Sequence, residues 1–132
     1  MPTTFNFEKI EVSTKPNWYL ACPQNYCGDN KKLVTPVFNM PRAKLEAAWE
    51  EVAAKLPRTQ LVSHNQKTNE YVYTQRSLML HFPDDIHVKF VDLGENQSGI
   101  LMYSQARYGY YDMGVNKARV KDWLKLLEQQ VA

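Results

Sequence analysis

The sequence predicts an α+β domain, a two-layer sandwich in which two helices pack on one face of an antiparallel meander sheet of four to five strands. Two segments repeat apolar residues every three or four positions, as amphipathic helices do. Between them, four segments alternate apolar and polar residues and are joined by short connections, which is typical of antiparallel strands. With 132 residues, the chain is long enough for one compact domain and too short for two.

The first part of the chain is expected to be an irregular arm over residues 1–40, overlapping the start of a single α+β domain over residues 36–132. Apolar residues come in short bursts here and prolines interrupt the segment repeatedly, so at most a short edge strand is expected. These prolines are Pro2, Pro16, Pro23, Pro36 and Pro41.

Two cysteines, Cys22 and Cys27, stand in the motif CPQNYC. Three interpretations are open: reduced structural thiols, a local disulfide, or a metal or redox site. A zinc site needs further ligands at paired spacing, which the sequence does not supply. We therefore expect no metal and no cofactor.

The segment PRAKLEAAWEEVAAKL, residues 41–56, predicts the first helix, with an apolar stripe that includes Leu45 and Trp49. Asn39 is predicted to cap this helix and Pro57 to end it.

Four strands are expected after this helix, and one face of their sheet is more polar than the other. The tripeptide Pro83-Asp84-Asp85 is predicted to form the turn between the second and third strands. The expected strands cover residues 59–64, 70–82, 86–93 and 99–107.

The final helix is predicted to begin near Asn116, a residue type that caps helix N-termini well. Its apolar stripe includes Trp123, Leu124 and Leu127, so it is expected to pack beside the first helix on the sheet.

The stretch SQARYGYYDMGVNKAR, residues 104–119, joins the last strand to this helix and carries the main candidate site. Arginine side chains near a helix N-terminus suit a carboxylate or phosphate, so a small anionic ligand or an acidic partner group is the expected occupant. The alternative is a purely structural corner, in which Asp112 pairs with Arg107 or Arg119. The candidate ligand-binding residues are Arg76, Ser104, Arg107, Asp112, Asn116 and Arg119.

A second cluster, HFPDDIH, contains His81, Asp84, Asp85 and His87. These residues support the alternative function, a small hydrolytic enzyme with carboxylate and imidazole as acid and base. The sequence has no nucleophile elbow and no phosphate-binding glycine loop. A non-enzymatic binding or interaction domain is therefore the leading expectation.

The net charge of +2 is small, which disfavours nucleic acid as a partner. No run of residues is apolar enough to span a membrane, and the N-terminus lacks a signal-peptide pattern. A cytoplasmic location is the default expectation. A periplasmic or envelope-associated location is the alternative if a signal or anchor has been removed.

The pattern Ser104-x-x-Arg107-x-Gly109-x-x-Asp112-x-Gly114-x-Asn116-x-x-Arg119 resembles the C-terminal signature of a family called domain of unknown function 1499. Three upstream features resemble further landmarks of this family in the same order: LPR at residues 56–58, the pair Arg76-Ser77, and the run FPDDI. The resemblance covers most of the chain from about Pro36 onward. It implies no established reaction, cofactor or catalytic residue, although many relatives are envelope-associated or carry an N-terminal anchor or signal.

Overall fold

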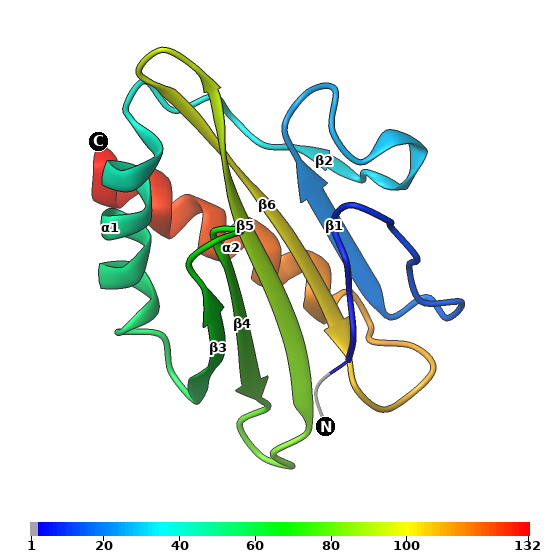
Figure 1. The fold of residues 1–132 in the computed structure, drawn as a ribbon. Helices are drawn as coiled ribbons and strands as arrows, with labels where there is room; N and C mark the ends of the chain where they lie inside the picture. Colours follow the sequence, from blue (N-terminus) through cyan, green and yellow to red (C-terminus); the bar gives the residue numbers. More distant parts are fainter. Residues whose placement is uncertain (1–2) are drawn as a thin grey trace.

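A computed structural model of the protein describes residues 3–132 and contains one six-stranded sheet and two α-helices (Figure 1). The predicted α+β class is confirmed. The elements are β1 (Trp18–Cys22), a short 3-10 turn (Gly28–Asn30), β2 (Leu33–Val34), α1 (Arg42–Ala53), β3 (Thr59–Asn65), β4 (Glu70–Arg76), β5 (Pro83–Gly94), β6 (Gln97–Ala106) and α2 (Val115–Val131).

The strands lie in the order β2-β1-β6-β5-β4-β3. Strands β3 to β6 form the predicted antiparallel meander, each paired with the next along the chain. Strand β1 then adds antiparallel to β6, and β2 adds parallel to β1. The sheet therefore has six strands and one parallel pair, instead of the four to five antiparallel strands expected.

Strand β1 lies inside the segment that was expected to be irregular, residues 1–40, of which residues 1–2 fall outside the described part. It is an internal strand because its sequence, WYLAC, is apolar on both faces. Tyr19 and Ala21 pack in the cluster under the helices, whereas Leu20 and Cys22 pack in a second cluster on the opposite face. A strand with two buried faces reads as a continuous apolar run, which alternation does not detect.

The connection between β4 and β5 differs from the prediction. Pro83, Asp84 and Asp85 are not a turn but the first residues of β5, where they pair with Arg76, Gln75 and Thr74. The turn is the preceding segment, residues 77–82, which was predicted as strand. It is closed by two hydrogen bonds between Ser77 and Phe82, from the Ser77 N–H to the Phe82 carbonyl and from the Phe82 N–H to Ser77 Oγ, each 2.9 Å long.

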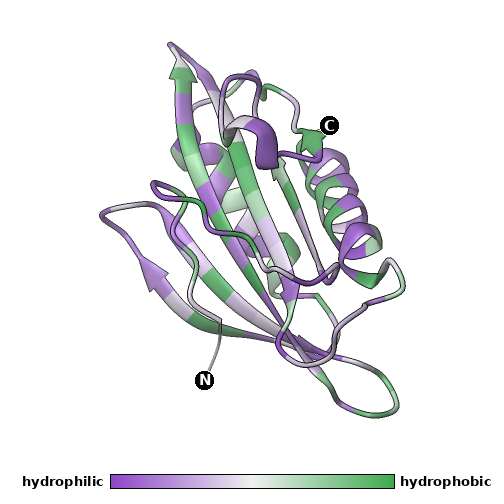
Figure 2. Cartoon of the chain, turned by 90° about the vertical axis from the view of Figure 1, so that its right-hand side faces the viewer, coloured by the Kyte–Doolittle hydropathy of each residue, from purple (hydrophilic) through white to green (hydrophobic). Residues whose placement is uncertain are grey.

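Both helices pack on one face of the sheet, as predicted, and Figure 2 shows the helix that leads to the C-terminus lying along that face. Their apolar stripes meet sheet residues such as Tyr73 and Phe90 in the main core. The predicted caps are wrong at both helices. Pro41 precedes α1 without a side-chain cap, and α2 begins after Gly114, in a left-handed conformation, with Asp112 supplying the capping oxygens.

The opposite face of the sheet is also covered, although its strands are more polar in sequence. The N-terminal segment runs across it, and Phe5 stacks on Tyr103 with 3.9 Å between ring centroids. Phe7 packs into the same cluster. This segment turns what would be an exposed sheet face into a second core.

Cys22 and Cys27 form a disulfide, one of the three interpretations that the sequence left open. It closes the loop that follows β1.

Loop-closure entropy predicts that opening the Cys22–Cys27 disulfide across so short a loop costs about 2 kcal/mol of unfolding free energy. We expect a reductant to lower the midpoint temperature of thermal unfolding of the protein. The same reductant should leave the midpoint of a Cys22→Ala/Cys27→Ala variant unchanged. Free thiols in the purified, unreduced protein, detected by alkylation and peptide mass spectrometry, would contradict this disulfide.

Neither helix in residues 3–132 combines the length and the apolar character needed to cross a bilayer.

Candidate functional site

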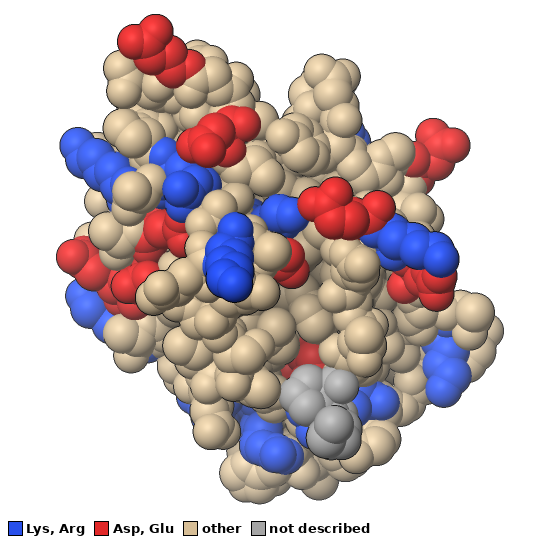
Figure 3. All heavy atoms as spheres, viewed as in Figure 1, with Lys and Arg blue, Asp and Glu red and all other residues tan. Residues whose placement is uncertain are grey.

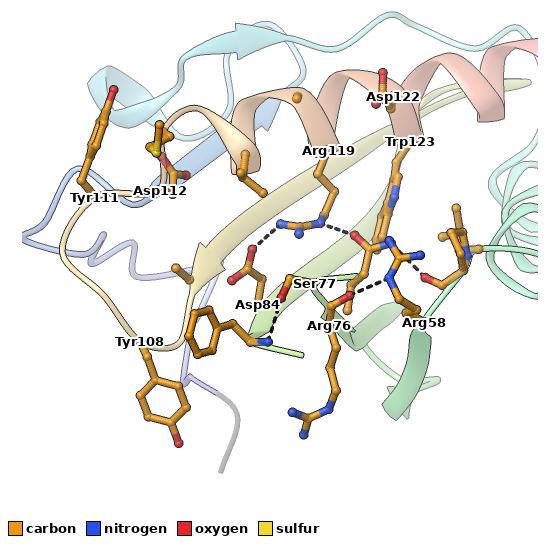
Figure 4. A pocket seen from close by; sticks show the side chains of 18 of the residues that line it. Arg58, Arg76, Ser77, Asp84, Tyr108, Tyr111, Asp112, Arg119, Asp122 and Trp123 are labelled. Atoms are coloured by element: carbon orange, nitrogen blue, oxygen red, sulfur yellow. Dashed lines mark hydrogen bonds and ion pairs between the residues drawn. The ribbon is translucent and has the colours of Figure 1, made fainter. Parts of the chain in front are cut away.

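A pocket of about 630 Å³ lies at the end of the sheet where β4 stops, β5 starts and α2 begins (Figure 4). Its walls come from the segment after α1, the β4–β5 loop (residues 77–82), the β6–α2 loop (residues 107–114) and the first turns of α2. More of the wall surface is apolar than polar, although six charged side chains also line it. The apolar wall includes Leu56, Phe82, Met113, Val115, Trp123 and Leu126.

An ion pair between Asp84 and Arg119 lies within the polar part of the pocket, with Arg119 Nη1 2.8 Å from Asp84 Oδ2. Both side chains are largely buried, with 13% and 8% of their surface exposed. Arg119 Nε also donates to Gln75 Oε1, and its Nη1 donates to Asn116 Oδ1. Figure 4 shows Asp84 and Arg119 in the middle of the pocket, with Tyr108 and Tyr111 on the loop to one side. Arg119 is therefore held in one orientation by three different elements.

Arg107 lies on the opposite face of the sheet and takes no part in this pocket. Its guanidinium makes two hydrogen bonds to the buried carboxylate of Asp85, 2.7 Å from Nη2 to Oδ1 and 3.1 Å from Nε to Oδ2. Asp85 also accepts from the Thr74 hydroxyl and from the Thr3 backbone N–H. Because successive strand residues point to opposite faces, Asp84 and Asp85 form ion pairs with two different arginines.

Asp112 pairs with neither arginine. Its carboxylate accepts hydrogen bonds from the backbone N–H groups of Gly114 and Asn116 and from the Asn116 side-chain amide. Asn116 is completely buried, and its amide also donates to the carbonyl of Asn17 while its oxygen accepts from Ser104 Oγ. Ser104 and Asn116 thus hold the start of α2 against the sheet and have no free face toward the pocket.

Arg58 and Arg76 lie at the mouth of the pocket. Arg58 Nε donates to the Arg76 carbonyl, and Arg76 Nη1 donates to the His81 carbonyl. Within residues 3–132, neither terminal nitrogen of Arg58 has a hydrogen-bond partner. In Figure 4, the Arg76 side chain extends away from Arg119. Arg58, which was not among the predicted site residues, is therefore better placed to meet a ligand than Arg76.

The four residues of the HFPDDIH cluster do not converge. Asp84 faces the pocket, whereas Asp85 and His87 face the N-terminal segment on the other side of the sheet, where His87 Nε2 lies 3.0 Å from the Thr3 carbonyl oxygen. His81 lies in the β4–β5 loop with a positive φ of 56°. In the described residues, no three His, Cys, Asp or Glu side chains are grouped so as to hold a metal ion.

The pKa values of the two neighbouring aspartates are shifted in opposite directions. Burial raises the pKa of Asp84, and the attraction of Arg119 offsets only part of that rise. Burial also acts on Asp85, but the hydrogen bonds from Arg107, the Thr3 N–H and Thr74 outweigh it and lower the pKa of Asp85. An NMR titration of the carboxyl carbons should therefore find Asp84 above and Asp85 below the usual value of about 3.9. Titration of both groups at one pH, or in the reverse order, would contradict the two environments.

Comparison with known protein families gives a match over most of the chain. The sequence model of a family described as protein of unknown function, DUF1499, matches residues 8–127. The chain belongs to the DUF1499 family. No curated protein matches the chain.

In this DUF1499 chain, the residues of the C-terminal pattern divide among three tasks. Arg107 binds Asp85 on one face of the sheet, and Asp112 caps α2. Ser104, Asn116 and Arg119 form a hydrogen-bonded group on the other face, of which Arg119 reaches the pocket.

Sequence reasoning missed the partners of both arginines, together with Arg58 and the apolar wall. The missing signal was available in part. Had Asp84 and Asp85 been assigned to a strand, alternation would have placed them on opposite faces of the sheet, but it would not have shown which arginine each one meets. Nothing in the sequence places Leu56 and Trp123 in one pocket wall, because their positions depend on how α1 and α2 pack.

Proposed function

We propose that this DUF1499 chain is a binding domain whose pocket at the end of the sheet accepts a small amphipathic acid. The carboxylate or phosphate of such a ligand would meet Arg58 and Arg119, and its apolar body would lie along Trp123, Leu126 and Met113. Pockets that bind small molecules are typically mostly apolar, with a few convergent polar groups that fix the orientation of the ligand.

The observation that carries this proposal is the position of Arg58 at the edge of a wall that is otherwise mostly apolar. Its two terminal nitrogens have no partner among residues 3–132, so they can form a two-pronged hydrogen bond with an acidic group. Arg119 is partly neutralised by Asp84, but its Nη2 is not hydrogen-bonded within the described chain. The ligand would thus add a second acidic group beside an existing ion pair.

Charge also bears on the class of ligand. Figure 3 shows Lys and Arg side chains interleaved with Asp and Glu over the face seen in Figure 1, without a large patch of one sign on that face of the described chain. Nucleic-acid binders usually carry a continuous basic surface. We therefore favour a small ligand that meets one or two arginines.

The test is a binding titration with octyl phosphate, octanoate and octyltrimethylammonium, followed by backbone amide NMR. Both anions are expected to shift amide signals of the pocket wall, and the cation is expected to leave them unchanged. Loss of a charge-assisted hydrogen bond predicts that Arg58→Gln weakens binding of the anions by about tenfold or more.

Lys44→Gln is the matched control, because it removes an exposed positive charge from α1 outside the pocket wall. Equal binding of the cation and the anions, or an equal effect of Arg58→Gln and Lys44→Gln, would overturn the proposal. A failure of both anions to bind at millimolar concentration would do the same.

The disulfide supports an oxidising compartment as the place of action, because cytosolic thiols are normally kept reduced. This favours the periplasmic or envelope-associated alternative over the cytoplasmic default. Alkylation of free thiols in intact source cells before lysis would leave Cys22 and Cys27 unlabelled there, whereas labelling of both would support the cytoplasm.

A further inference from the structure

Two loops at the pocket end of the sheet expose large apolar side chains. In the β4–β5 loop, Leu78, Met79 and Leu80 are consecutive and are 70%, 85% and 69% exposed. In the β6–α2 loop, Met113 is 82% exposed, and three tyrosines are exposed as well. Isolated apolar residues are normal on protein surfaces, but so dense a group points to an interaction site. The exposed side chains of the two loops are Leu78, Met79, Leu80, Phe82, Tyr108, Tyr110, Tyr111 and Met113.

The two loops flank the same pocket. Ser77 and Phe82 from one loop and Tyr108, Tyr111 and Met113 from the other line a single cavity. Figure 1 shows both loops projecting from the same end of the sheet, opposite the β5–β6 turn. The apolar side chains are therefore carried on two projecting tips with a cavity between them.

Three arginines and three aspartates line the pocket between these tips, so their formal charges balance, but Arg58 and Arg76 form no ion pair within residues 3–132. Asp84 is paired with Arg119, and the carboxylate of Asp112 is used by the N–H groups at the start of α2. Of the remaining charged groups that line the pocket, Arg58 and Arg76 outnumber Asp122. Lys117 adds a further exposed positive charge in the first turn of α2, directly after the β6–α2 loop.

We propose that the two loops dock this end of the protein onto an anionic lipid bilayer. Leu78, Met79 and Leu80 enter the boundary between headgroups and acyl chains, and the tyrosines lie at headgroup depth, where their amphipathic rings are favoured. Arg58 and Arg76 then face the negative headgroups. Projecting tips separated by a cavity suit insertion into a fluid interface, whereas a protein partner would need a continuous complementary surface.

This docking does not depend on the ligand proposed for the pocket. It does place the pocket mouth at the bilayer surface. The two proposals fail separately, because octyl phosphate binding is measured without vesicles and vesicle binding is measured without added ligand.

The experiment is flotation of the full chain with vesicles of phosphatidylcholine containing 30 mol% phosphatidylglycerol, and with vesicles of phosphatidylcholine alone. We expect flotation with the anionic vesicles and weaker flotation with the neutral ones. Loss of the buried apolar surface predicts that Leu78→Ser/Met79→Ser/Leu80→Ser reduces the partition coefficient at least about tenfold. Arg58→Gln/Arg76→Gln should reduce it by about fivefold per charge, and only for the anionic vesicles.

Val34→Ser/Val37→Ser is the matched apolar control, because both residues are half exposed. Val34 lies in the edge strand β2 and Val37 lies just after it, away from the two loops. Unchanged thermal unfolding of the triple variant shows that its fold is retained. The proposal is overturned if the wild-type chain does not float with anionic vesicles, or if the triple variant and the control behave alike. It is also overturned if the loops instead hold two copies of the chain together, seen as a dimer that the triple variant abolishes without any vesicle binding.

Discussion

Replacing Asp85 by alanine is expected to lower the free energy of unfolding by about 3–5 kcal/mol at neutral pH. The Asp85 side chain is fully buried and forms a two-pronged ion pair with Arg107, of whose side chain 14% is exposed. The variant leaves the guanidinium largely buried without its counter-charge. It also removes the acceptor that holds the Thr3 N–H, which anchors the N-terminal segment to the sheet.

Chemical denaturation of four proteins measures this effect: the wild type, Asp85→Ala, Arg107→Met and the double variant. The double variant is expected to be more stable than Asp85→Ala, because it leaves no unpaired buried charge. Asp29→Asn, at an exposed aspartate, is the control and should change stability by no more than about 0.5 kcal/mol. Strict additivity of the two single losses would show that the pair is not coupled.

The same pair gives the protein a pH dependence of defined sign. The pKa of Asp85 is lowered in the folded state, so its contribution to stability is present above the unfolded value of about 3.9. That contribution is lost as pH falls through the folded value. The wild type is therefore expected to lose more stability than Asp85→Ala on acidification below pH 4.

Replacing Trp49 by alanine is expected to cost about 3–5 kcal/mol of unfolding free energy. Trp49 lies at the centre of the main core, fully buried between α1, α2 and the sheet. Its ring lies 5.9 Å from those of Tyr73 and Trp123, measured between centroids, and its indole N–H donates to the Tyr73 hydroxyl at 2.8 Å. The variant removes the contact of Trp49 with Trp123 between the two helices and leaves a buried hydroxyl without its donor.

Tyr73→Phe separates these two effects, because it keeps both aromatic rings but leaves the buried Trp49 N–H without its acceptor. Its expected cost is about 1–3 kcal/mol, the range for an unsatisfied buried polar group. Tyr110→Ala, at an exposed aromatic residue, is the control and should stay within about 0.5 kcal/mol of the wild type. If Trp49→Ala destabilises no more than Tyr110→Ala, the two helices do not share the core described above.

The helices and the meander were predictable because their signals are local. The apolar stripe that includes Leu45 and Trp49 has helical spacing, and the alternation of Tyr71, Val72 and Tyr73 specifies a strand with one face toward the helices. Strand β1 was missed for a physical reason. One of its faces is buried by the C-terminal helix, which is distant in sequence, and the other by the irregular N-terminal segment, which has no strand or helix pattern of its own.

The sequence predicted where the arginine-containing connection lies, but not which carboxylate pairs with each arginine. The cluster from Ser104 to Arg119 does end a strand and start a helix, and Arg119 does line a pocket there. Which carboxylate each arginine meets depends on the register of β5 against β6, which sets Asp84 beside Ala106 and Asp85 beside Gln105. Register is fixed by contacts between strands, so the local sequence around Asp112 could not reveal it.

The sequence by itself determined the family, the α+β class, the two amphipathic helices and the strand-to-helix connection that lines the pocket. Periodicity and residue types at fixed spacing carry this information, because they reflect the local geometry of helix and strand. The tertiary structure alone decided that Asp84 and Asp85 divide the two arginines between opposite faces, that Asp112 caps a helix, and that Arg58 joins the pocket wall. Each of these outcomes depends on side chains from separate elements meeting in the fold, and no local pattern specifies such a meeting.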